Sequence, residues 1–181
     1  SLDWEIVPVT DKIADAPEFA VLVDKYKDLL SKLAEPIGMT AVELDATSFS
    51  SRNKETNIGN FIADSYRSVT NSDIGFVNGG SIRADLTYNP GMLTKRDVLA
   101  ILPFNNPIVK IEISGKTLRE VLEHGVARSA EDSEPGRFPQ VSGITFTYDI
   151  SKPAGNRGSE IKIGGQPLNE SKNYTLATSD F

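Results

Sequence analysis

The sequence predicts a single α/β domain, of the mixed α+β kind, in which helices pack on mixed sheets. Amphipathic helical stretches interleave with short apolar strands in the first two thirds of the chain, and strands gather in the last third. No internal repeat or long linker divides the 181 residues. A chain of this length fits one domain of about 100–200 residues and needs no metal or disulfide to fold.

Five elements are expected in the first half, and each rests on its hydrophobic pattern. They are a strand at 4–9, a helix at 16–35, a strand at 40–44, a helix at 56–69 and a strand at 73–77. The two helices repeat apolar residues every three or four positions, whereas the strands alternate or form short apolar runs. Pro17 suits a first helical turn, and Pro36 with Gly38 ends that helix.

The second half continues the pattern and then changes character. We expect a helix from Thr94 to Pro103, a strand at 108–113, a helix at 118–126, and strands at 144–148, 160–163 and 174–177. Thr94 and Asp97 resemble a capping box, in which each residue bonds the backbone N–H of the other. The polar stretch 129–139 is predicted to be a loop, and Gly164-Gly165 indicates a tight hairpin.

Composition narrows the functions open to this chain. It has no Cys and a single His, His124, so neither a multi-histidine metal site nor a cysteine nucleophile can be built from it. Its 19 basic and 25 acidic residues give a net charge of −6, which argues against a nucleic-acid partner. No apolar run approaches the roughly 20 residues of a membrane span. We therefore expect no multi-histidine metal site in this chain, and most enzyme classes are disfavoured.

The segment Asn78–Arg83 carries the strongest local signal of a binding site. An apolar strand ends there in Asn-Gly-Gly, where the backbone can approach a ligand closely. The Arg83 guanidinium suits bidentate contact with phosphate or paired oxygens. A tight turn with an Asn cap and a surface Arg explains the same residues, so both interpretations stay open at this point.

Three further residues have a functional and a plain interpretation. Arg52 precedes a helix and could bind an anion, or could be a solvated loop residue. Phe104, between two prolines and beside Asn106, could stack on a base or pack into the core. His124, with no second His or Cys to share a metal, is interpreted as a helix-surface or hydrogen-bonded histidine.

Four stretches in order and at family spacing resemble the C-terminal domain of the 5′-nucleotidase family of bimetallic nucleotide phosphohydrolases. They span Arg52 to Phe181 and are Arg52–Asp64 (R-N-K-E-T-N-I-G-N-F-I-A-D), Asn78–Arg83 (N-G-G-S-I-R), Ile101–Asn106 (I-L-P-F-N-N) and Gly136–Gly143 (G-R-F-P-Q-V-S-G). The resemblance implies that residues 1–45 are an N-terminal strand and connecting helix, and that 46–181 are the nucleotide-binding domain.

The resemblance also implies a substrate-binding set with no catalytic member. Its residues are Arg52 and Arg83 at the phosphate or ribose end, Asn78 at the ribose, Phe104 and Phe181 on the two faces of the base, Asn106 at its edge, and Gly80 and Gly143 where backbone approaches the ligand. Aromatic faces for a base and fixed donors for oxygens fit the chemistry of a nucleoside phosphate.

In such enzymes a calcineurin-like N-terminal domain holds two divalent metal ions, such as Zn or Mn, and performs the hydrolysis. Its D-x-H, G-N-H and G-H-x-H motifs do not occur in this chain. The resemblance therefore implies that this chain is a fragment of a parent hydrolase and is also shortened after Phe181. It implies that the fragment is inactive alone and that the metallophosphoesterase domain is its partner. Because members of this family are secreted or attached to the cell surface, the resemblance implies an extracytoplasmic location. The alternative hypothesis is a non-enzymatic ligand-binding or protein-interaction module with the same fold.

Overall fold

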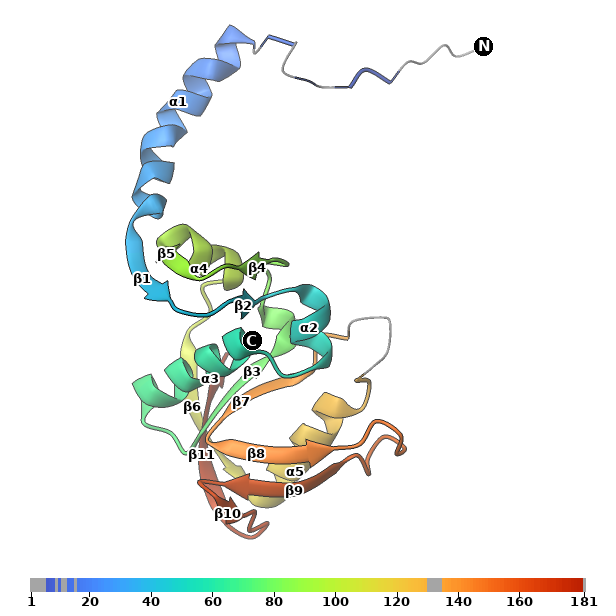
Figure 1. The fold of residues 1–181 in the computed structure, drawn as a ribbon. Coiled ribbons are helices and arrows are strands. Elements are labelled where there is room, and N and C mark those ends of the chain that lie inside the picture. Colours follow the sequence, from blue (N-terminus) through green and yellow to red (C-terminus); the bar gives the residue numbers. More distant parts are fainter. Residues whose placement is uncertain (1–5, 9, 11–12, 15, 130–134, 181) are drawn as a thin grey trace.

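The computed structural model describes residues 6–8, 10, 13–14, 16–129 and 135–180. Helices and short 3₁₀ turns among them are α1 (Pro17–Ser31), η1 (Lys32–Ala34), α2 (Ser48–Asn53), α3 (Asn57–Thr70), η2 (Gly79–Ser81), α4 (Lys95–Ile101) and α5 (Gly115–Val126). The strands are β1 (Pro36–Thr40), β2 (Leu44–Asp45), β3 (Ile74–Asn78), β4 (Thr87–Tyr88), β5 (Gly91–Thr94), β6 (Ile108–Ser114), β7 (Pro139–Ser142), β8 (Ile144–Tyr148), β9 (Gly158–Ile163), β10 (Gln166–Pro167) and β11 (Asn173–Ser179). The predicted class, helices on mixed sheets, is confirmed (Figure 1).

A mixed four-stranded sheet forms the centre of the molecule, in the order β6-β11-β3-β7. The outer pairs are antiparallel and the β11–β3 pair is parallel. Side chains of β3 alternate between the two faces of this sheet, as the period of a strand requires. Ile74 and Phe76 pack into one core, and Val77 packs into the other. The C-terminal end of this doubly buried strand is therefore held firmly in place.

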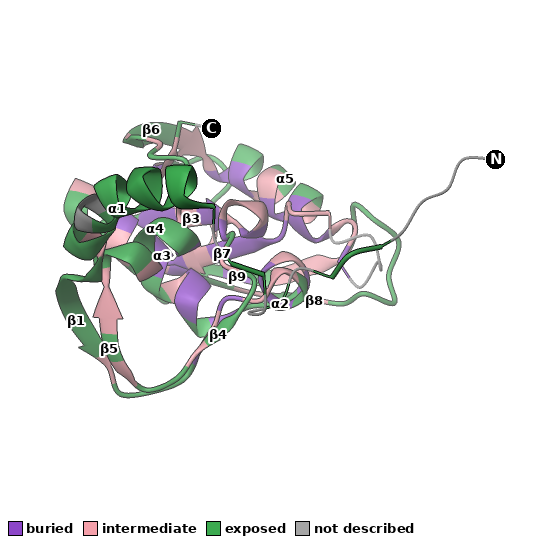
Figure 2. Ribbon diagram, turned by 90° about the horizontal axis from the view of Figure 1, so that it is seen from above, coloured by how far each residue is buried: buried purple, intermediate pink, exposed green. Residues whose placement is uncertain are grey.

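Each face of the central sheet is covered by its own layer (Figures 1 and 2). Ile58, Ile62 and Tyr66 of α3 bury against one face. On the other face lie α5, through Leu118 and Leu122, and the three-stranded antiparallel sheet β10-β9-β8. The N-terminal part of the chain adds two small ribbons, β1–β5 and β2–β4, beside the α3 layer.

Helix α1 extends away from this body (Figure 1). Its predicted apolar stripe forms but finds no neighbour within the described structure, since the side chains of Phe19, Leu22, Val23, Tyr26 and Leu30 are about half exposed or more. Soluble proteins rarely leave so long an apolar stripe uncovered without a partner for it. The stripe bears on the proposed function below.

Most predicted elements are confirmed, with shifts of a few residues at their ends. The helices expected at 16–35, 56–69, 94–103 and 118–126 correspond to α1 with η1, α3, α4 and α5, and the Thr94–Asp97 capping box forms as predicted. The strands at 73–77, 108–113, 144–148, 160–163 and 174–177 and the hairpin at Gly164-Gly165 are also present.

Three local predictions need correction or fall outside the described chain. The strand expected at 40–44 is instead two strands, because the Thr40 hydroxyl bonds the main chain of Val42 and turns the chain between β1 and β2. Helix α2 and the short strands β4, β5, β7 and β10 were not predicted. Of the strand expected at 4–9, residues 1–5 and 9 lie outside the described residues, and Ile6–Pro8 have no regular structure.

A pH dependence follows from the parallel β3–β11 contact. The backbone N–H and the hydroxyl of Thr175 both donate to the Asp73 carboxylate, each at 2.8 Å, and hold its pKa below the ordinary value. A carboxyl with a lowered folded-state pKa stabilises above its unfolded-state pKa, and this stability is lost as the pH falls through the folded-state value. Asp73→Asn should therefore lower the urea midpoint at pH 7, and its difference from the parent chain should shrink below about pH 4. An equal difference at pH 7 and pH 3 would contradict the assignment.

Candidate functional site

The turn that follows β3 is fixed by its neighbours on both sides. The backbone N–H of Gly79 donates to the Phe138 carbonyl at 2.8 Å, and that of Gly80 donates to the Gly136 carbonyl at 2.7 Å. The Asn78 side chain accepts a hydrogen bond from the Ser81 hydroxyl at 2.7 Å. The amide group of Asn78 is thereby oriented by the turn that carries it.

Glycine is required at position 79 because α2 lies directly against the turn. A Cβ atom at Gly79 would overlap the Ser51 carbonyl oxygen and would lie 3.1 Å from the Arg52 Cα. Backbone atoms cannot move aside as the end of a flexible side chain can. The missing side chain therefore lets the segment that carries Arg52 approach the turn that carries Asn78.

Both ends of the short helix α2 are tied to other elements. At its start, the Ser48 N–H donates to the Asp85 carboxylate at 2.8 Å, and this hydrogen bond is the main reason that the pKa of Asp85 is lowered. At its end, the buried Gln140 side chain donates to the carbonyl oxygens of Ser51 and Lys54. Arg52 is half-buried between these two ties.

The larger of two cavities at the turn has a volume of about 710 Å³, which lies within the usual range for small-molecule sites. Its lining residues are Arg52, Phe76, Asn78, Gly80, Thr117, Glu120, Val121, His124, Gly125, Pro135, Gly136 and Arg137. Among the lining residues that the structure describes, two arginines and one glutamate give a positive balance in a chain of net charge −6, which favours an anion.

One wall of the larger cavity was not predicted as part of the site. Thr117, Glu120 and His124 share one face of α5, at spacings of three and four. His124, expected from the sequence to be a helix-surface or hydrogen-bonded histidine, is exposed and lines this cavity. The helical period could have placed these three on one face, but no local pattern connects that face with Asn78.

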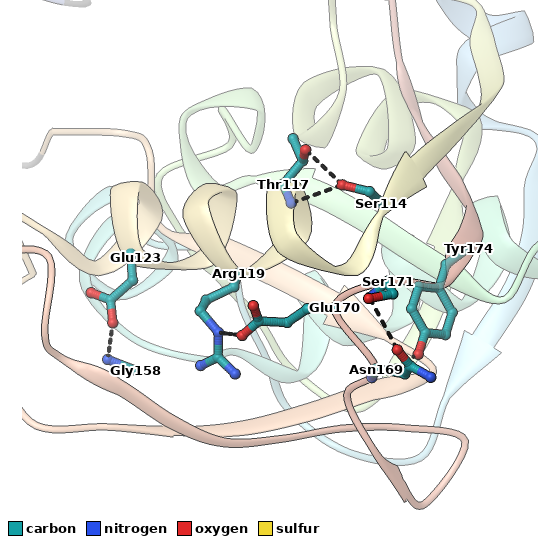
Figure 3. Close-up of polar contacts among 9 residues, drawn as sticks. All are labelled: Ser114, Thr117, Arg119, Glu123, Gly158, Asn169, Glu170, Ser171 and Tyr174. Carbon is teal, nitrogen blue, oxygen red and sulfur yellow. Dashed lines mark hydrogen bonds and ion pairs between the residues drawn. The ribbon is translucent and has the colours of Figure 1, made fainter.

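Polar contacts hold α5, the helix that forms this wall, in position (Figure 3). Ser114 caps the helix start, and Arg119 forms a 2.7 Å ion pair with Glu170. The Glu123 carboxylate accepts a 2.6 Å hydrogen bond from the Gly158 N–H of β9. The cavity wall is therefore tied to the outer sheet as well as to the core.

A second cavity, of about 200 Å³, lies on the other side of the turn. It is lined by Tyr66, Ser81, Leu102, Phe104, Asn105, Asn106, Ile108 and Ser179. The Phe104 ring is 56% exposed, so the structure excludes the alternative that this side chain packs into the core. A flat exposed ring at the edge of a small cavity can stack on a planar group.

Arg83 contacts one lining residue of each cavity. Its guanidinium lies 5.8 Å from the centroid of the Phe104 ring, and its Nη1 donates to the Gly80 carbonyl at 3.4 Å. The first contact is a cation–π interaction, which holds the charge over the ring face. A planar group stacked near Phe104 would therefore lie close to a guanidinium.

The predicted site residues fall into five groups. Arg52, Asn78 and Gly80 line the larger cavity, and Phe104 and Asn106 line the smaller one; Arg83 lines neither but contacts Phe104 and Gly80. Gly143 lines neither cavity: it has a φ of +74° at the β7–β8 junction, where a Cβ atom would overlap the Asp73 carbonyl oxygen. Phe181 lies outside the described residues.

Within the described part of the chain, no group of three or more His, Asp or Glu side chains is arranged to hold a metal ion. The same residues contain no helix with the length and apolarity to cross a membrane. The described site offers groups suited to recognition: an aromatic face, three guanidinium groups and an oriented amide.

Comparison with known proteins matches this architecture to one family. Residues 36–181 match the family described as "5'-nucleotidase, C-terminal domain". The chain is 33% identical over 186 residues to the trifunctional nucleotide phosphoesterase protein YfkN of Bacillus subtilis, covering 97% of this chain and 12% of that protein. It is 33% identical over 193 residues to a 5′-nucleotidase of Diplobatis ommata, covering 96% of this chain and 33% of that protein.

A solved structure agrees with the sequence matches. The 5′-nucleotidase precursor from Thermus thermophilus superposes with a TM-score of 0.80 at 28% identity, over 90% of this chain and 32% of that one. The chain thus spans about a third or less of the length of these relatives.

The close contact at Gly79 predicts a strong effect of a single methyl group. Gly79→Ala should lower the free energy of unfolding by about 1–3 kcal/mol or more, because the added Cβ meets backbone that cannot yield. Gly38→Ala is the matched control, since nothing lies within 4 Å of a Cβ at that position. Urea denaturation measures both variants, and equal stabilities would refute the contact between the turn and α2.

Proposed function

Because the chain belongs to the family of 5′-nucleotidase C-terminal domains, we propose that it is the substrate-binding domain of a phosphohydrolase that converts nucleotides to nucleoside and phosphate. The observation that carries the proposal is the exposed Phe104 ring, with the Arg83 guanidinium over it, between two cavities. An aromatic face beside a fixed cation matches a ligand with a flat base and an anionic group.

In this proposal the smaller cavity receives the base. Phe104 stacks on one face of it, and Asn106 offers amide donors and acceptors at its edge. Stacking tolerates every base, because each has a π face, so selectivity among bases would rest on Asn106 and its neighbours. Phe181 is proposed as the second stacking ring.

The arginines and the Asn78–Gly80 turn receive the sugar and phosphate. Arg52 and Asn78 line the positively balanced cavity, and Arg83 stands at its boundary. A guanidinium donates two parallel hydrogen bonds to a phosphate, which gives orientation as well as affinity. Asn78 would bond a ribose hydroxyl, since its amide is already oriented by Ser81.

Hydrolysis of the phosphate ester is assigned to a preceding domain. The described residues have no cluster suited to divalent metals, and relatives named as 5′-nucleotidases are about three times longer than the matched region. Two ions such as Zn or Mn, held in that domain, would activate water and neutralise charge on the phosphate. This chain's residues bind and orient the nucleotide for that centre.

The exposed stripe of α1 is proposed to pack on the same domain. The matched region, residues 36–181, is described as a C-terminal domain, and α1 lies on its N-terminal side, where a preceding domain would connect. Burying a large apolar side chain contributes roughly 1.5–3 kcal/mol, so the stripe would fix how the domains meet.

Among the relatives are snake venom 5′-nucleotidases, which supports an extracytoplasmic location for this protein.

The binding role is tested by calorimetric titration of the chain with adenosine and with AMP, without metal. Loss of base stacking should weaken adenosine binding in Phe104→Ala by roughly 5- to 150-fold. Phe61→Ala is the control, because Phe61 is similarly exposed, at 63%, and lines neither cavity. The affinity of this variant for adenosine should equal that of the parent chain. Equal losses in the two variants, or tight binding that Phe104→Ala leaves intact, would overturn the proposal.

The docking role of α1 is tested in the protein that carries both domains. Leu22→Ser with Tyr26→Ser should lower the thermal midpoint of that protein and raise its KM, because the domains lose their apolar contact. In the isolated chain, where these side chains are exposed, the same pair should change stability little. Lys25→Ser, on the polar face of α1, serves as the control. Equal changes of the thermal midpoint in the two-domain protein and in the isolated chain would contradict the docking. A gene without an upstream metal-binding domain would favour the alternative, a non-enzymatic interaction module.

A further inference from the structure

Gln140 of β7 is a fully buried polar side chain close to the site, with 0% of its surface exposed. Its Nε2 donates to the carbonyl oxygens of Ser51 at 2.9 Å and Lys54 at 2.8 Å. Its Oε1 accepts from the Thr56 N–H at 3.0 Å. Only one orientation of the amide satisfies two acceptors and one donor, so the contacts define the side chain completely.

These three partners lie at the junction between α2 and α3. The last carbonyl groups of a helix and the first N–H groups of the next have no partner within their own helices. Gln140 supplies partners for both at once, and Arg52 lies between the two carbonyls that it binds. The position of the Arg52 main chain therefore depends on a side chain of a different element, β7.

Two glycines surround this arrangement and leave it room. A Cβ at Gly59 would overlap Oε1 of Gln140, and a Cβ at Gly79 would overlap the Ser51 carbonyl oxygen. The Arg52 segment is thus held between the Gln140 amide and the Gly79 turn. Since Gln140 pairs with Val77, next to Asn78, in the β3–β7 ladder, one amide fixes the distance between the arginine and the turn.

We propose that Gln140 is a positioning residue for ligand binding, which acts through Arg52 and touches no ligand. The inference rests on the proposed function, because Arg52 must contact the nucleotide for its position to matter. Gln140 lines neither cavity, so an effect of its replacement on affinity has to pass through another residue.

A general loss of stability is the competing explanation, and the chain offers a matched control for it. Ser142 lies two residues further along β7, is also buried, and donates to the Asp64 carboxylate at 2.5 Å. Ser142→Ala removes a buried hydrogen bond between the same strand and α3, yet it leaves the Arg52 segment untouched.

The experiment is a double-mutant cycle read by calorimetric titration with AMP and adenosine. Gln140→Met keeps the side-chain volume and removes all three hydrogen bonds. We expect Gln140→Met and Arg52→Ala to weaken binding of the same ligand by factors that agree within about twofold. The double variant should lose no more affinity than either single variant. Ser142→Ala should bind like the parent chain, and Phe104→Ala should add its own loss independently.

Each other outcome has a distinct meaning. Normal affinity in Gln140→Met, with a clear loss in Arg52→Ala, overturns the positioning role and leaves the proposed function standing. Additive losses in the double variant overturn it as well. No effect of Arg52→Ala and Phe104→Ala alike overturns the proposed function itself. If Gln140→Met does not fold, Gln140→Asn, which keeps the amide but shortens its reach, is titrated in its place with the same expectations.

Discussion

The burial of β3 on both faces is the constraint on which the rest of the structure depends. Ile74 and Phe76 commit one face to the core under α5, and Val77 commits the other to the core under α3. A strand pinned in this way can neither slide nor rotate, because a shift of one residue would exchange its faces. The Asn78 turn at its end therefore has a fixed origin, and the site is built outward from it.

What the sequence could predict follows from the range of each physical signal. Helical period and capping act within one or two turns, so α3, α4 with its Thr94 cap, and α5 were predictable. Phe104 and the Asn-Gly-Gly turn could also be selected as candidates, because each signal lies within a few neighbouring residues. Helix α2 was not predictable, since its six residues have little period of their own and its ends are held by Asp85 and Gln140, 37 and 89 positions away from their partners.

The site itself shows the same limit more sharply. Arg52 and Asn78 could be singled out separately, but only the folded chain shows that the missing side chain of Gly79 brings them together. The wall formed by Thr117, Glu120 and His124 had no signal that tied it to a ligand. Gly143 shows the converse, because a positive φ and a close neighbour there serve the contact with Asp73 within the protein. Glycine in a motif indicates close approach without saying what approaches.

In the proposed function the two cavities divide recognition of the nucleotide between base and phosphate, and this division would have a consequence for catalysis. An aromatic pocket would give affinity that does not depend on the ester, whereas the arginines would respond to the position of the phosphate. A domain that only binds must still present that phosphate in one orientation, since a reacting atom misplaced by about 1 Å can cost a hundredfold in rate. The buried amide of Gln140 resists such displacement, because each backbone group it releases would cost about 1–3 kcal/mol. Under the proposed function, rigidity at α2 is then what this domain would contribute to hydrolysis in a preceding domain.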